Sequence, residues 1–98
     1  ETSRNNKKQL VGIMNFIYHK STWSENNVCY LEDLFIIEDY RSKGYASALL
    51  NHLTKICNIN NIDRIYWKTK FDNHIAQSLY DKVAIKTDFL EYEIILKN

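Results

Sequence analysis

Residues 28–47, VCYLEDLFIIEDYRSKGYAS, decide the fold because an apolar strand gives way to a helical pattern within them. The segment 28–37 is the most apolar run of the chain and predicts a strand, which a loop at 38–41 follows. From residue 43 to 57 apolar side chains recur every three or four positions, which predicts a helix with one apolar face. Gly44, one of only two glycines in the chain, lies at the start of this helix.

The sequence before this stretch predicts a hairpin. Residues 9–18, QLVGIMNFIY, are rich in β-formers and predict a strand, whereas the polar residues 1–8 predict a frayed end. The polar cluster at 21–27 has no helical periodicity and predicts a turn. Because the connection is short, the strands at 9–18 and 28–37 are expected to pair antiparallel.

The sequence after it predicts a strand at 64–69, a helix at 74–83 with Asp72 as its N-cap, and a last strand or bent strand pair at 85–97. The strands at 28–37 and 64–69 and the helix between them form a βαβ unit, which is expected to be parallel and right-handed. The predicted fold class is therefore α/β (α+β), with a mixed, mostly antiparallel sheet and a central parallel βαβ unit.

Composition limits the class of protein. A chain of 98 residues suits a single small domain, for which we expect modest stability or support from a partner subunit or a bound ligand. The formal net charge of +1 argues against a dedicated nucleic-acid partner. No signal peptide and no apolar run of about 18 residues occurs, so we expect no membrane partner and a cytoplasmic location. The chain begins with Glu1 rather than Met, which leaves N-terminal truncation of the domain open.

The two cysteines, Cys29 and Cys57, lie inside apolar patterns and are expected to be buried free thiols. A disulfide stays open but is less favoured, because small secreted scaffolds normally carry more cysteines. The sequence has no CxxC pair and no Cys/His spacing typical of a metal site, so no metal is expected.

The stretch RSKGYAS, residues 41–47, has the make-up of a diphosphate site. A helix start leaves backbone N–H groups unpaired and carries a partial positive charge, which together stabilise an anion. Gly44 would let a phosphate approach the backbone, and Arg41 and Lys43 add formal positive charge. The stretch matches neither the P-loop nor the dinucleotide-binding motif. Plain turn chemistry at a helix start is the alternative interpretation.

Two motifs resemble those of the GNAT family of N-acetyltransferases. Residues 41–46, RSKGYA, fit the pyrophosphate motif R/Q-x-x-G-x-G/A, and residues 72–80, DNHIAQSLY, are similar to the N-x-x-A-x-x-L/F-Y helix of the family. Residues 30–41, YLEDLFIIEDYR, resemble the preceding strand and loop of diamine acetyltransferases. The resemblance covers about residues 9–97 and implies the GNAT (acyl-CoA N-acyltransferase) fold, here lacking the usual N-terminal strand and helices.

The resemblance implies transfer of the acetyl group of acetyl-coenzyme A (acetyl-CoA) to a primary amine by direct attack in a ternary complex. The acceptor would be a small amine, a polyamine or an amino acid. Backbone groups of the strand would pair with the pantetheine arm and hold the oxyanion. The helix start would bind the diphosphate, and Asn73 would fix an amide of the arm. The implied coenzyme-binding residues are Leu34, Phe35, Ile36, Arg41, Ser42, Lys43, Gly44, Tyr45, Ala46, Ser47, Asn73, Ala76 and Tyr80.

Two adjacent acids interrupt the apolar strand, and a base is what this chemistry requires. An alkyl amine with a pKa of about 10.4 is mostly protonated at neutral pH and must lose a proton before it attacks. The resemblance implies Glu32 as amine ligand or base. Asp33 would attract a cationic acceptor or serve as the alternative base. Because neighbours on a strand point to opposite faces, the two are not expected to share one role. Solvent-facing strand acids are the alternative interpretation.

Tyr80 matches the general acid of the family, placed to protonate the leaving thiolate, although burial in the core is the ordinary fate of a tyrosine on a helix face. Tyr30, together with Trp23, is expected to line the acceptor pocket beside Glu32 and Asp33. A catalytically degenerate acyl-CoA-binding module or partner subunit remains an alternative function, as does a protein-lysine acetyltransferase. A homodimer also stays open.

Overall fold

The computed structural model describes residues 2–4 and 10–96. Its elements in chain order are β1 (Thr2–Arg4), β2 (Leu10–His19), β3 (Val28–Ile36), the 3₁₀ helix η1 (Glu38–Tyr40), α1 (Tyr45–Ile59), β4 (Ile65–Tyr66) and α2 (His74–Val83). The strands form one sheet in the order β1-β2-β3-β4, with β3 and β4 parallel and the other pairs antiparallel. The predicted mixed fold, its hairpin and its parallel βαβ unit are confirmed.

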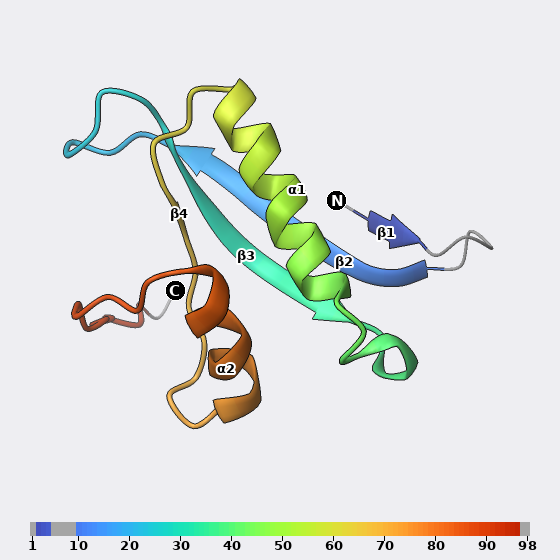
Figure 1. The fold of residues 1–98 in the computed structure, drawn as a ribbon. Helices are drawn as coiled ribbons and strands as arrows, with labels where there is room; N and C mark the ends of the chain where they lie inside the picture. The colour runs from blue at the N-terminus through green and yellow to red at the C-terminus, as the bar shows by residue number, and fades with distance from the viewer. Residues whose placement is uncertain (1, 5–9, 97–98) are drawn as a thin grey trace.

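Helix α1 packs across one face of β2 and β3 (Figure 1). The apolar stripe predicted from the sequence is the face that it buries, with Leu49, Leu50 and Leu53 at 0–6% exposure. These side chains contact the core side of the sheet, where Met14 and Leu31 are buried. Each fully buried leucine contributes about 1.5–3 kcal/mol, so this contact fixes the position of α1 on the sheet.

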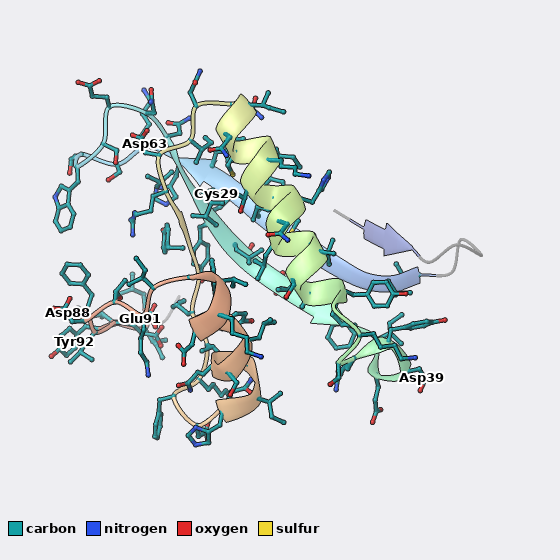
Figure 2. The ribbon with its side chains drawn as sticks, in the orientation of Figure 1. Cys29, Asp39, Asp63, Asp88, Glu91 and Tyr92 are labelled. Carbon is teal, nitrogen blue, oxygen red and sulfur yellow. The ribbon has the colours of Figure 1, made fainter. Side chains whose placement is uncertain are left out.

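The two cysteines meet in this core. Cys29 of β3 lies beneath α1 (Figure 2), and both Cys29 and Cys57 are free and buried, as the sequence predicts. Burial, assisted by the neighbouring Cys57, raises the pKa of the Cys29 thiol to about 12. The thiol therefore stays protonated and behaves as a small apolar side chain.

The N-terminal end differs from the prediction. Residues 1–8 are expected to be frayed, but Thr2–Arg4 form a strand that pairs antiparallel with β2. Residues 1 and 5–9 lie outside the described residues, and with them most of the predicted frayed end and the first residue of the strand expected at 9–18. A short edge strand needs no apolar pattern of its own, which is why composition did not reveal it.

The strand predicted at 85–97 is wrong over its described part, because residues 85–96 contain no strand. The strand predicted at 64–69 is likewise reduced to Ile65–Tyr66. A strand needs a ladder partner, and alternation of apolar side chains supplies none by itself. After Tyr66 the chain leaves β3, and Trp67 packs against the core and the ring of Tyr80 instead. Large apolar side chains of residues 85–96 consequently remain exposed.

Gly12→Ala tests how closely β2 and β3 pack. A Cβ atom at Gly12 would lie 2.7 Å from the Phe35 carbonyl oxygen and 2.7 Å from Ile36 Cδ1. Because the carbonyl belongs to the backbone, we expect the free energy of unfolding to fall by about 1–3 kcal/mol. Urea denaturation measures it, with Ile17→Ala as a control at a half-exposed position of the same strand. A smaller loss for Gly12→Ala than for Ile17→Ala would contradict this account.

Candidate functional site

The candidate site begins where β3 and β4 separate. Their pairing joins Cys29 with Ile65 and Tyr30 with Tyr66, and within the described ranges it goes no further. Figure 1 shows the strands β3 and β4 running side by side and then diverging, with β3 leading to η1 and α1 and β4 leading to α2. Beyond Tyr30, β3 keeps β2 on one edge, while the other edge has no strand partner in the described part of the chain. The predicted pantetheine-binding residues Leu34, Phe35 and Ile36 lie on this segment. An unpaired strand edge is suited to ligands that carry amide groups.

A bulge at Glu32 shapes the same segment. Asn15 of β2 pairs with Asp33 and the next residue, Phe16, pairs with Leu31, so Glu32 is an extra residue in β3. Leu31 and Leu34 both pack against the α1-side core although they are three positions apart. The two acids fill the interval between them and are both exposed.

The bulge breaks the plain alternation from which the two acids are predicted to point to opposite faces. Asn15 lies between two core-facing residues of β2, and its Nδ2 donates to Asp33 Oδ2 at 3.3 Å. The Asp33 carboxylate is therefore on the sheet face opposite α1. Glu32 is the extra residue of the bulge and is exposed. Two adjacent exposed carboxylates attract a cationic amine.

At its far end β3 leads to the N-terminus of α1. Gly44 is the N-cap and has φ 86°, in the left-handed region, and Ser42 also has a positive φ of 61°. A Cβ atom at Gly44 would meet nothing within 4 Å, so the glycine is required by backbone conformation rather than by crowding. No side chain hydrogen-bonds to this end of α1 within the described ranges. The first N–H groups of α1 are therefore not capped by a side chain, as an anion site requires.

The two cations of the predicted diphosphate stretch lie along this turn. Arg41 Nε donates to the carbonyl oxygen of Ile36 at 2.9 Å, and its guanidinium lies 5.4 Å from the ring centre of Phe35. Lys43 Nζ lies 5.8 Å from the ring centre of Tyr40. Arg41 thus ties the turn to the end of β3. The remaining predicted residues, Tyr45, Ala46 and Ser47, form the half-buried first turn of α1.

Helix α2 supplies the last predicted residues, with one correction. Its N-cap is Asn73, whose Oδ1 accepts from the Ala76 N–H at 3.2 Å, and not the predicted Asp72. The turn before it is closed by the Gln77 side chain, which donates to two backbone carbonyls of that turn. The Asn73 amide oxygen is therefore occupied in the fold, while its Nδ2 group is the end suited to a ligand carbonyl.

Tyr80 lies one turn after Ala76 on α2. Its ring centre is 5.3 Å from that of Trp67 in an edge-on contact, and both rings pack against the core. Burial raises the pKa of Tyr80 above its ordinary value of 10.0. The phenol is therefore a neutral O–H donor at physiological pH, the state that a general acid requires.

Other features of the described residues lie outside this arrangement. A hollow of about 160 Å³ lies between α1, β4 and the end of α2, and none of the predicted site residues lines it. No group of three or more His, Cys, Asp or Glu side chains in the described part of the chain could hold a metal ion. Neither helix described here combines the length and the apolar character needed to cross a membrane.

The sequence of the chain matches a known family. The profile described as the Acetyltransferase (GNAT) family matches residues 3–84. The chain belongs to the GNAT family. A D-amino-acid N-acetyltransferase of Saccharomyces cerevisiae is 34% identical over 83 residues, which cover 85% of this chain and 52% of the yeast protein. The chain thus spans about half the length of this curated relative.

Solved structures share the fold. A ribosomal-protein-alanine N-acetyltransferase from Brucella melitensis biovar Abortus 2308 superposes with a TM-score of 0.84 at 21% identity, over 99% of this chain and 69% of that one. An aminoglycoside acetyltransferase from an uncultured soil metagenomic sample gives a TM-score of 0.83 at 22% identity, over 95% of this chain and 62% of that one. At these identities the likeness concerns the fold alone.

Asn73→Ala tests the cap of α2. Loss of the hydrogen bond to the Ala76 N–H is expected to lower the free energy of unfolding by about 1 kcal/mol, whereas Asn73→Asp keeps an acceptor and should lose only a small part of it. Thermal unfolding followed by circular dichroism compares the two variants. Equal destabilisation by both would contradict a capping role for the side-chain oxygen.

Proposed function

We propose that this GNAT chain transfers the acetyl group of acetyl-CoA to a primary amine by direct attack in a ternary complex. The observation that carries the proposal is that β3, after it separates from β4, leads to the uncapped N-terminus of α1. A strand edge that is free to pair, followed by an anion site, corresponds in order to the pantetheine arm and diphosphate of one coenzyme molecule.

In this proposal the coenzyme lies along β3 and ends at α1. Its diphosphate accepts hydrogen bonds from N–H groups of residues 41–47, with Arg41 and Lys43 adding charge. The pantetheine amides pair with the backbone of residues 34–36. Asn73 donates its Nδ2 to the arm, and Ala76 offers a small surface one turn later. These roles are supported by the open edge, by the uncapped helix start and by the matching motifs.

The amine reacts at the bulge. Glu32 takes a proton from the ammonium group, directly or through water, and the neutral nitrogen attacks the thioester carbonyl carbon. The negative charge that develops on the carbonyl oxygen is stabilised by a backbone N–H of β3. When the C–S bond breaks, the thiolate takes the proton of the Tyr80 hydroxyl. The nitrogen gives up its second proton as the amide forms; this proton restores the Tyr80 hydroxyl through water, and the proton on Glu32 is released to solvent. Asp33, held by Asn15, attracts the cationic acceptor, and Tyr30 lines its path.

An amino acid is the acceptor class that we favour, because the yeast relative is named a D-amino-acid N-acetyltransferase. Small amines and polyamines are the competing classes. We also propose a cytoplasmic location, which suits the two free thiols. A homodimer is proposed because apolar side chains such as Ile85, Leu90 and Ile94 are 80–90% exposed in this chain.

Gly44→Asp tests the diphosphate site. The substitution places a carboxylate at the α1 N-cap, where it repels the diphosphate and competes for the same N–H groups. We expect coenzyme A to bind at least about tenfold more weakly by calorimetric titration, which corresponds to about 1.4 kcal/mol. Ala48→Asp introduces the same charge at an exposed position one turn along α1 and should weaken binding less. Unchanged affinity in Gly44→Asp would reduce the stretch to a helix start.

Tyr80→Phe separates an enzyme from a binding module. Removal of the general acid is expected to lower kcat by about a hundredfold or more, while the affinity for coenzyme A is unchanged. Release of free thiol from acetyl-CoA, measured with a panel of primary amines, gives the rate. If the unsubstituted protein binds coenzyme A but releases no thiol with any amine, the degenerate binding module is the better description. If Tyr80→Phe turns over normally, the acid is another group.

A further inference from the structure

We infer that Lys68 selects the acceptor by binding a carboxylate on it, so that the site favours amino acids over polyamines. This inference rests on the proposed function and adds a specificity residue that lies in neither family motif. It follows from where the structure places one lysine relative to the two acids at the bulge.

Lys68 lies on the acceptor side of the sheet. Tyr30 sits between the core-facing residues Cys29 and Leu31 and therefore points away from α1. It pairs with Tyr66 of β4, and the two ring centres are 4.9 Å apart. Lys68 Nζ lies 5.8 Å from the centre of the Tyr30 ring. The lysine is thus on the face that also carries Asp33.

The offset along the sheet between Tyr30, over whose ring Lys68 lies, and Asp33 suits a zwitterion. Tyr30 pairs with Ile17 and Asp33 pairs with Asn15, two residues apart on β2, which is roughly 7 Å along the strand. An amino acid that makes a charge-assisted hydrogen bond of about 2.8 Å at each end reaches somewhat beyond this backbone offset, and the side chains of Asp33 and Lys68 can take up the difference. The flexible four-carbon stem of Lys68 allows the final adjustment.

Glu91 pairs with Lys68 in the structure. Lys68 Nζ lies 2.6 Å from Glu91 Oε2, with the two side chains 54% and 56% exposed. The hydrogen bond to Glu91, followed by one with Tyr30, raises the pKa of Lys68, which keeps it cationic. Exposed pairs of this kind contribute little, so a carboxylate on the acceptor can replace that of Glu91. Glu91 lies on the C-terminal segment with Asp88 and Tyr92, away from Asp39 of η1, which comes shortly before the proposed diphosphate stretch (Figure 2).

The same geometry disfavours a polyamine. A second ammonium group, extended from the bulge toward Tyr30, would meet Lys68 and also Arg64, whose guanidinium lies 4.5 Å from the ring centre of Tyr66. Like charges in this position repel. The acids at the bulge attract any amine, and Lys68 then decides what the rest of the acceptor carries.

The test compares amino acids with their carboxamides, which keep the amine but lack the charge. For Lys68→Met in the full chain, we expect KM for the amino acid to rise by about twofold to fivefold, as when an ion pair between half-exposed groups is lost. KM for the carboxamide and the affinity for coenzyme A should be unchanged. Lys70→Met removes the same charge two residues along the chain and is the matched control. Glu91→Gln frees Lys68 and should lower KM for the amino acid.

The outcomes separate this inference from the proposed function. If the unsubstituted protein acetylates amino acids and carboxamides with equal efficiency, or if Lys68→Met weakens both equally, carboxylate recognition by Lys68 is wrong while the acetyltransferase stands. A marked preference for polyamines would overturn it as well. If no amine of any class is acetylated, the proposed function fails first. Circular dichroism of each variant confirms that the fold is retained.

Discussion

One extra residue in β3 is the constraint on which the site depends. The bulge at Glu32 comes two positions after Tyr30, where β3 makes its last pair with β4. A bulge bends its strand and increases the local twist, so it turns β3 away from its parallel neighbour. The same residue therefore leaves a strand edge without a strand partner, exposes two adjacent carboxylates, and leads β3 toward the start of α1.

The proposed anion end of the candidate site combines a helix held by the core with a preceding turn of strained backbone. Leu49 and Leu53 bury the middle of α1 against the sheet, so its N-terminus cannot shift without loss of core contacts. The preceding turn has positive φ angles at Ser42 and Gly44, a conformation that is strained for a residue other than glycine such as Ser42. The Arg41 bond to the Ile36 carbonyl joins this turn to β3. The positions of β3 and of the N-terminus of α1 are therefore fixed relative to each other, and a ligand that contacts both would bind to a preformed arrangement.

Local sequence patterns predicted the secondary-structure elements that depend mainly on local interactions. The stripe through Leu49 and Leu53 predicted α1 to within two residues at each end, and the helix predicted at 74–83 has those bounds. The segment 85–96 alternates as a strand should, yet it forms none because pairing depends on a partner elsewhere in the chain. The N-cap of α2 is Asn73, one residue after the predicted Asp72, and the sequence could not distinguish them because both residue types suit that position.

Motifs could locate the candidate site but not its arrangement. The acids in an apolar strand were a sign of something unusual at Glu32, but nothing in the sequence marks a bulge there, and the prediction of opposite faces assumed an unbroken alternation. Lys68 gave no signal at all, because its relation to Tyr30 and Glu91 arises only when β4 and the C-terminal segment are placed.

Tyr80 shows how packing and chemistry meet in the same contact. Its ring lies against that of Trp67, which directly follows β4 and packs against the core. The contact between the two rings holds α2 against the segment that follows β4. Burial in this environment raises the pKa of the Tyr80 phenol. A tyrosine in solvent would lack both the ring contact and the raised pKa. The divergence of β4 that frees the edge of β3 thus also creates the buried environment that raises the pKa of Tyr80.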